Sequence, residues 1–172
     1  MMNHFEVEEA LETIRLLVDT REKPTKKLQA RIDMVGWPWE RVKLAQGDYS
    51  AECLLPSGEV FSLADKLVIE RKMSLEELCM CFGSERRRFE REFERAKEAG
   101  CKIHLLVEEA TWRKIYSHRY KSKYNPNALI ASINAYRARY DMQLDFCSAE
   151  LTGYLIRDIL YREMKERLQN DT

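Results

Sequence analysis

The hydrophobic positions of this 172-residue chain alternate between short apolar runs and longer stretches with helical spacing. The short runs predict strands at 14–18, 42–45, 49–55, 60–63, 64–72, 102–107 and 143–147. After an acidic amphipathic stretch at the N-terminus, helical spacing predicts helices that begin near Pro24, Ser74, Ser84, Trp112, Pro126 and Ser148. This alternation of strands and helices predicts one α/β domain in which helices flank a mixed central sheet.

Polar residues with capping side chains mark where several of these helices begin. Ser74, Ser84, Asn125 and Ser148 are predicted N-caps, because their side chains can accept hydrogen bonds from the first free backbone N–H groups of a helix. Glu77 lies three residues after the first of these serines and predicts a capping box there. Glycines and prolines close the predicted elements and leave no room for a long linker.

The strand predicted at 64–72 ends in a charged tripeptide, Glu70, Arg71 and Lys72, directly after a buried-type run. Successive side chains of a strand point to opposite faces, so Glu70 and Lys72 share one face and Arg71 points to the other. A carboxylate beside an ammonium group suits metal-assisted hydrolysis of a phosphodiester, because the carboxylate binds a hard divalent cation and the lysine orients or deprotonates a water. A surface ion pair at a strand end is the alternative interpretation.

Three acidic residues after other predicted strands favour the catalytic interpretation. Asp19 and Glu22 follow the strand at 14–18, and Asp48 follows a tight glycine turn. Asp19, Asp48 and Glu70 are therefore candidate ligands of the metal. Carboxylate oxygens on several strand ends are the arrangement that a hard cation and an activated water require.

Cationic residues near these acids complete the candidate site. Lys72 is the candidate to serve the attacking water. Arg21 and Arg71 are candidates to stabilise the phosphate or to hold the acids in place, since hydrolysis places additional negative charge on the phosphorus oxygens.

The chain has 29 basic and 29 acidic residues, but their distribution is uneven. A basic block at 111–140 has no acid and contains Arg113, Lys114, Arg119, Lys121, Lys123, Arg137 and Arg139. Aromatic residues lie between these charges, a pattern typical of nucleic-acid contact surfaces, and we expect Arg119, Lys121 and Lys123 to contact a nucleic acid, with Arg21 as a further phosphate-contacting candidate. A solvated loop with scattered tyrosines is the alternative.

A second basic feature lies on the helix predicted after Ser84. Arg88, Arg91 and Arg95 form a stripe beside the apolar positions of this helix. Glutamates at 90, 94 and 98 balance the stripe, which favours a solvated helix face over a binding surface.

The remaining composition limits the class of protein. No apolar run reaches the length of a membrane span, and the acidic N-terminus has no signal-peptide pattern. The number of cysteines is odd and none forms a Cys-x-x-Cys pair, which indicates reduced thiols rather than a disulfide framework or zinc site. We therefore expect a cytoplasmic, intracellular protein without a membrane segment.

Three short motifs resemble the nuclease domain of the XPF-type structure-specific endonucleases. They are Leu-Val-Asp-Thr-Arg-Glu at 17–22, Gly-Asp-Tyr at 47–49 and Ile-Glu-Arg-Lys at 69–72, followed by Ser-Leu-Glu-Glu-Leu at 74–78. The signature of this PD-(D/E)xK family is Val-Asp-x-Arg-Glu, then Gly-Asp, then Glu-Arg-Lys with an acid four residues after the lysine. The resemblance spans about 14–160 and implies a restriction-endonuclease-like fold and DNA cleavage that depends on Mg²⁺ or Mn²⁺.

The resemblance also implies a role for each matched residue. By match, Asp48 and Glu70 would be the main metal ligands, with Asp19 and Glu22 as supporting acids. Lys72 would be the catalytic lysine.

Two further positions complete the match with that family. Arg71 would belong to the same site, and Glu76 replaces the Asp that is usual after the lysine. Members of the family often carry a C-terminal tandem helix-hairpin-helix domain, but no such hairpins occur here. We expect residues 1–172 to form a single, stand-alone nuclease domain.

The expected function is that of a metal-dependent endonuclease acting on branched or flapped DNA in repair or recombination. The alternative is a non-catalytic DNA-binding or scaffold subunit, because the resembled family includes inactive partners. A decayed partner would be expected to lose the acids or the lysine, so the presence of Asp19, Asp48, Glu70 and Lys72 favours the enzyme.

The resemblance further implies a homodimer, because nuclease domains of that family pair with a like domain. On the last helix, Leu151, Leu155 and Ile159 are predicted to form an apolar stripe, and Tyr154 and Ile156 widen it. A helix that simply covers one side of the sheet is the alternative explanation for this stripe.

Overall fold

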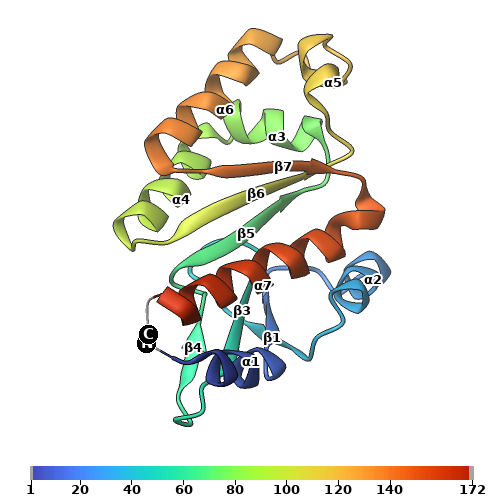
Figure 1. Ribbon diagram of the computed structural model, residues 1–172. Helices are drawn as coiled ribbons and strands as arrows, with labels where there is room; N and C mark the ends of the chain where they lie inside the picture. The colour runs from blue at the N-terminus through green and yellow to red at the C-terminus, as the bar shows by residue number, and fades with distance from the viewer. Residues whose placement is uncertain (1, 171–172) are drawn as a thin grey trace. The chain divides into compact units, whose positions relative to one another are not determined.

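The computed structural model describes residues 2–170 and confirms the α/β class, with seven strands in a mixed sheet flanked by helices (Figure 1). The chain divides into two compact units. The first unit comprises Met1–Val68 and Gly153–Thr172, and the second comprises Ile69–Thr152. None of the helices within the described residues is long and apolar enough to cross a membrane.

The first unit contains strand β1 with a paired strand on each side, a short added strand and three helices. Strand β1 (Arg15–Asp19) pairs in parallel with β2 (Trp39–Val42) and antiparallel with β3 (Tyr49–Leu54), and β3 also pairs antiparallel with β4 (Val60–Ser62). The helices of this unit are α1 (His4–Glu12), α2 (Lys26–Val35) and nearly all of α7 (Thr152–Asn170).

Strand β2 lies nearer the N-terminus than the predicted strand at 42–45. It has only one neighbour in the sheet, β1, and its side chains are exposed or half-buried. An edge strand of this kind does not need a continuous apolar run, so the apolar residues at 42–45 gave a misleading signal.

Helix α7 packs through a different stripe from the predicted one. Its fully buried apolar residues recur every four positions, at Ile156, Leu160, Met164 and Leu168. Leu151 is 49% exposed and precedes α7, in the 3₁₀ turn η1 (Ala149–Leu151). The predicted stripe was therefore wrong in register, because apolar residues at adjacent positions made the stripe too wide to show which edge is buried.

The start of α7 approaches α2 closely at a glycine. A Cβ atom placed on Gly153 would lie 2.5 Å from the carbonyl oxygen of Arg31 and 2.5 Å from the Cβ of Met34. Both distances are too short for a real contact, so only glycine lets the two helices pack at this spacing.

The second unit contains strands in the order β5, β6 and β7, of which β5 (Leu67–Lys72) carries the chain into it from the first unit. Strands β6 (Lys102–Glu108) and β7 (Gln143–Cys147) pair in parallel. Its helices are α3 (Leu75–Phe82), α4 (Arg86–Glu98), α5 (Trp112–Tyr116) and α6 (Pro126–Tyr140). Aromatic rings from α3, α4 and α6 form its core, with centroids 4.9 to 5.5 Å apart, in Phe82, Phe89, Phe93, Tyr136 and Tyr140.

The predicted helix caps are confirmed at two of four positions. The side chain of Ser74 accepts from the Glu77 N–H, and that of Asn125 accepts from the second and third residues of α6. Ser148 forms no side-chain cap, and the N-cap of α4 is Glu85 rather than Ser84, also without a capping side-chain bond. The α4 helix therefore begins without the hydrogen-bond acceptor that was predicted from Ser84.

Candidate active site

Asp19 ends β1 as a fully buried carboxylate with three donors around it. Its Oδ1 accepts from the backbone N–H of Arg21 at 2.8 Å and from the Arg21 Nε at 2.5 Å, and its Oδ2 accepts from the Leu44 N–H at 2.7 Å. Burial opposes ionisation, but the bonds from Arg21 and Leu44 outweigh it, so the pKa of Asp19 lies below its ordinary value. Asp19 is thus a charged residue that anchors the turn after β1.

A backbone hydrogen bond places Asp48 beside the turn that follows β1. The Asp19 N–H donates to the Asp48 carbonyl oxygen at 2.9 Å, and Gly47 has a positive φ of 73° that most other residues would resist. The Arg21 guanidinium also reaches the carbonyl oxygens of Leu44 and Gly47, at 3.5 and 3.3 Å. Arg21 therefore holds together the two segments that carry Asp19 and Asp48, one of the roles that the sequence suggested for it, and its contact with DNA stays a prediction.

Glu22 takes part in a largely buried polar network with two residues that the sequence analysis did not assign to the site. The Tyr49 hydroxyl donates to the Glu22 Oε2 at 2.8 Å, and the Arg31 Nη1 donates to that hydroxyl at 2.8 Å. The Arg31 Nη1 also lies 3.8 Å from the Glu22 carboxylate. Burial raises the pKa of Tyr49, which keeps its hydroxyl protonated as a donor.

A signal for Arg31 was present in the sequence. It lies within the apolar stripe of α2, between Leu28 and Ile32, and is itself buried. A charge on the buried face of a helix requires a partner in the interior, and here the partners are Tyr49 and Glu22.

In the second unit, Glu70 and Lys72 share one face of β5 as predicted. The Lys72 Nζ lies 2.5 Å from the Glu70 Oε1, and both residues are buried. Burial raises the pKa of Glu70, and the charges of Glu92 and Glu77 act in the same direction, while Lys72 opposes them. The carboxylate of Glu70 is therefore poorly compensated by its surroundings.

Arg71 points to the opposite face and forms a bidentate ion pair with Glu108 at the end of β6. The two bonds join Nε to Oε1 at 2.7 Å and Nη2 to Oε2 at 2.8 Å. The Thr152 hydroxyl donates to the same Glu108 Oε1 at 2.7 Å. Sequence reasoning missed Glu108, although it directly follows the apolar run at 103–107, as Glu70 follows 67–69.

Glu76, the acid after the lysine in the matched motif, accepts a hydrogen bond from a loop. Its Oε1 receives the backbone N–H of Lys121 at 2.7 Å, and this bond lowers the pKa of Glu76. Glu76 therefore anchors the segment at 117–125, which we call the basic loop.

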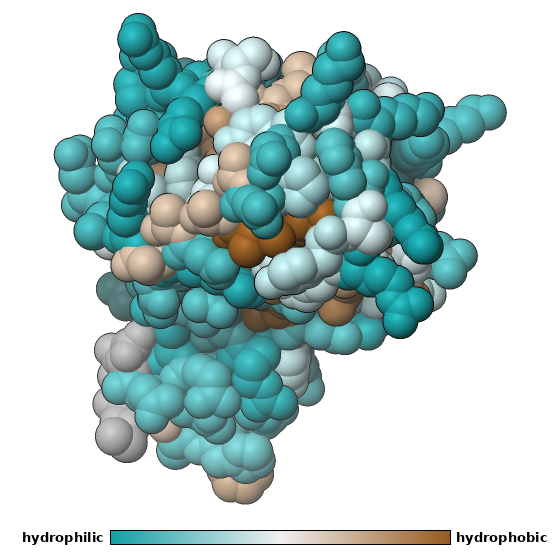
Figure 2. Space-filling view, turned by 90° about the horizontal axis from the view of Figure 1, so that it is seen from above, coloured by the Kyte–Doolittle hydropathy of each residue, from teal (hydrophilic) through white to brown (hydrophobic). Residues whose placement is uncertain are grey.

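The basic loop carries three of the predicted DNA-contacting residues. Arg119, Lys121 and Lys123 are all exposed on it, and across residues 2–170 none of their side chains forms an ion pair. From the side of α5 and α6, the surface of the molecule is mainly hydrophilic with only small apolar areas (Figure 2). The rest of the basic block is partly engaged, since Arg137 stacks on Trp112 with 5.5 Å between the guanidinium carbon and the ring centroid.

Hard oxygen ligands for a divalent cation are available in both units. Burial raises the pKa of Glu70, whose carboxylate pairs with Lys72, and Asp48 is half-buried next to the Asp19 turn. In the described part of the chain, no three His, Cys, Asp or Glu side chains already stand together as a set of metal ligands. The chemistry of the donors fits Mg²⁺ or Mn²⁺, which prefer carboxylate oxygens and retain several waters.

Comparisons with known proteins agree with the motifs. A family model described as the ERCC4 domain matches residues 18–157. Two solved structures share the fold. XPF from Aeropyrum pernix matches with a TM-score of 0.61 and 20% sequence identity over 87% of this chain. The structure of XPF from Aeropyrum pernix in complex with DNA matches with a TM-score of 0.62 and 22% sequence identity over 90% of this chain. The chain spans 61% and 66% of the length of these two chains. No curated protein matches it significantly.

Proposed function

Because this chain belongs to the ERCC4 domain family, we propose that it is a metal-dependent DNA endonuclease that cuts branched or flapped DNA in repair or recombination, inside the cell. The observation that carries this proposal is the buried pair of Glu70 and Lys72 at the end of β5. A buried ion pair is costly to maintain, and the raised pKa of its carboxylate is typical of catalytic groups.

In the proposed mechanism, Asp48 and Glu70, the matched family positions, would hold a divalent cation, Mg²⁺ or Mn²⁺, which when bound would supply positive charge for the scissile phosphate and lower the pKa of a water. Lys72 orients the attacking water through its Nζ, which the Glu70 Oε1 already holds at 2.5 Å.

The other matched residues act as positioning residues. Asp19 holds the turn that precedes Asp48, and Arg21 holds the same turn from its other side. Arg71 is occupied by Glu108 on the opposite face of β5, so we assign it the task of fixing the strand end that carries Glu70 and Lys72. Glu22 supports the first unit through Tyr49 and Arg31.

DNA is the proposed partner because the matched structure of Aeropyrum pernix XPF was determined in complex with DNA, and because the basic loop presents uncompensated charge. Pairing with a second copy of the chain is part of the proposal. A non-catalytic scaffold is the alternative, and the presence of both Glu70 and Lys72 in a buried pair favours the enzyme.

The deciding experiment is a cleavage assay on duplex, flap, fork and single-stranded DNA of matched sequence. We expect cutting of a branched substrate with Mg²⁺ or Mn²⁺, and none with EDTA or with the Glu70→Gln variant. Equal binding but no cutting of any substrate with either metal would support the scaffold instead. Cutting that persists in EDTA would contradict the metal dependence.

A further inference from the structure

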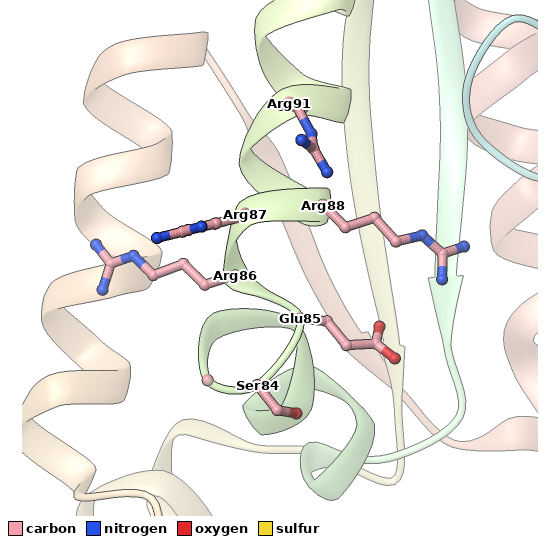
Figure 3. A pocket seen from close by; sticks show the side chains of 7 residues that line it. Ser84, Glu85, Arg86, Arg87, Arg88 and Arg91 are labelled. Atoms are coloured by element: carbon pink, nitrogen blue, oxygen red, sulfur yellow. The ribbon is translucent and has the colours of Figure 1, made fainter.

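A hollow of about 530 Å³ opens at the start of α4 and is lined by arginines. Its lining consists of Gly83, Ser84, Glu85, Arg86, Arg87, Arg88 and Arg91, and we call it the arginine pocket. Figure 3 shows Arg86 and Arg87 projecting to one side of α4, with Arg88 and Glu85 on the other side. The pocket lies wholly within the second unit.

The positive charge of this pocket is poorly compensated. Four guanidinium groups and one carboxylate leave a net charge of 4 − 1 = +3. All four arginines are exposed, and among residues 2–170 none of them takes part in an ion pair or a side-chain hydrogen bond. Glu90 of α4 pairs with Arg139 at 3.4 Å rather than with an arginine of the pocket.

The placement of these charges on the helix is also unfavourable for the protein alone. The first turn of α4 holds three arginines and no acid, and the N-cap residue forms no side-chain hydrogen bond. Partial positive charge at a helix N-terminus favours anions there and disfavours cations. Three arginines in the first turn lower the stability of the free helix. Binding of an anion at this end of α4 would offset that cost and explain their placement.

The arginine pocket adjoins the basic loop at one edge. Tyr124 of that loop donates its hydroxyl hydrogen to the Phe82 carbonyl oxygen at 3.3 Å. The ring of Tyr124 would lie 3.5 Å from a Cβ atom on Gly83, which lines the pocket. The loop therefore adjoins the pocket at Gly83, and Glu76 anchors the loop through the Lys121 N–H.

We propose that the arginine pocket binds a phosphodiester of a DNA strand that runs on to the basic loop. This inference rests on the proposed function only in taking DNA as the ligand, and it assigns the pocket to binding rather than to cleavage. Arginine suits this ligand because its planar guanidinium donates two parallel hydrogen bonds to phosphate oxygens. Free inorganic phosphate offers the same oxygen acceptors and is the alternative ligand of the pocket.

The test measures binding of a labelled DNA duplex in EDTA, so that cleavage plays no part. Fluorescence anisotropy across a range of salt gives the slope of log affinity against log salt. Removing one phosphate contact should lower that slope by about 0.9 and two contacts by about 1.8. The variants are Arg87→Gln and the double variant Arg87→Gln with Arg91→Gln. The matched control is Arg95→Gln, which removes one exposed charge from the same helix outside the pocket.

We expect both pocket variants to reduce the slope and Arg95→Gln to leave it unchanged. Pocket variants that behave like the control would overturn the inference, and so would pocket-dependent calorimetric binding of inorganic phosphate without any effect on DNA. Two outcomes separate this inference from the proposed enzyme. If the wild-type protein cleaves DNA but the pocket variants leave the slope unchanged, only the role of the pocket is contradicted. If the pocket variants reduce the slope but the wild-type protein does not cleave in Mg²⁺ or Mn²⁺, only the nuclease activity is contradicted.

Discussion

Asp19 and Glu70 both follow buried strands, yet their surroundings are opposite. Asp19 has three hydrogen-bond donors on its two oxygens and a lowered pKa. Glu70 is also buried but has a raised pKa, because burial and neighbouring acids outweigh the single ammonium of Lys72. The comparison teaches that a saturated carboxylate stabilises the fold, whereas an under-compensated one retains the capacity to bind a cation or to hold a reacting water.

The largest effect is expected at the proposed metal ligands. Glu70→Gln and Asp48→Asn should each reduce the cleavage rate by more than about a hundredfold, since even residues that only support metal ligands cost this much when they are lost. DNA affinity should persist, because phosphate contacts elsewhere supply it. Single-turnover kinetics and anisotropy on one substrate measure both quantities. Near wild-type cutting by either variant would remove that residue from the mechanism.

Lys72 tests the second half of the Glu70 pair. Lys72→Ala should lower the single-turnover rate by about 10²–10⁴-fold if the ammonium takes part in proton transfer. Lys72→Arg should not restore the rate, because a guanidinium keeps its proton and has a different shape. A fully active Lys72→Arg variant would mean that the side chain supplies only charge.

In the proposed function, the basic loop has a role in DNA affinity rather than in the chemistry. Replacing Arg119, Lys121 and Lys123 together by Gln should lower the slope of log affinity against log salt by up to about 2.7 on duplex DNA, about 0.9 for each lost contact. The rate at saturating protein should change little, because these residues lie outside the Glu70 pair. An unchanged slope would identify the loop as a solvated surface segment.

Asp19 should matter for stability more than Glu70 does. Asp19→Asn puts an amide donor against the donors of Arg21 and Leu44, and should lower the free energy of unfolding by about 1.5–3 kcal/mol at pH 7. The folded pKa of Asp19 is lowered, so its stabilisation is fully present above the unfolded value near about pH 4 and is lost as the pH falls through the folded value. Denaturant unfolding across this pH range checks both.

The control for Asp19→Asn is the corresponding substitution at Glu70. Glu70→Gln should cost less stability at neutral pH than Asp19→Asn, because the raised pKa of Glu70 means that its ionised form is disfavoured in the fold. For an acid with a raised folded pKa, the contribution to stability declines as the pH rises towards that value. Equal losses in the two variants would contradict the division of roles.

The smallest effect concerns pairing of two copies. Tyr154 is 45% exposed on the first turn of α7, whereas Ile156 is fully buried and belongs to the core. Tyr154→Glu should therefore leave a folded protein but weaken dimerisation and cleavage together, because a symmetric dimer repeats each residue. Light scattering coupled to size-exclusion chromatography measures the mass. A fully active wild-type monomer would end the dimer proposal.

Local patterns were enough to locate most strands and the acids that follow them. The apolar run at 67–69 predicted the end of β5, and strand alternation placed Glu70 and Lys72 on one face. Long-range partners were not predictable in this way. Glu108 meets Arg71 from 37 positions away along the chain, and nothing in the local pattern specifies which strands become neighbours.

Errors at the ends of elements have a related cause. Ser84 has the chemistry of an N-cap, but α4 begins one residue later than that cap would place it, with Glu85 as its N-cap and with Phe89 and Phe93 in the aromatic core. The register of α7 was similarly decided by packing rather than by local hydrophobicity. Tertiary contacts therefore corrected local preferences at these two helices without changing the class of the fold.

The close approach at Gly153 has a consequence for mutational tolerance. The carbonyl of Arg31 lies against Gly153, while the guanidinium of the same residue holds Tyr49 and, through it, Glu22. Any side chain at position 153 would displace the backbone of α2 and so move the Cα atom from which the Arg31 side chain extends. Position 153 should therefore accept glycine alone in a saturation library, and losses there would be transmitted to an acid 131 positions earlier in the chain.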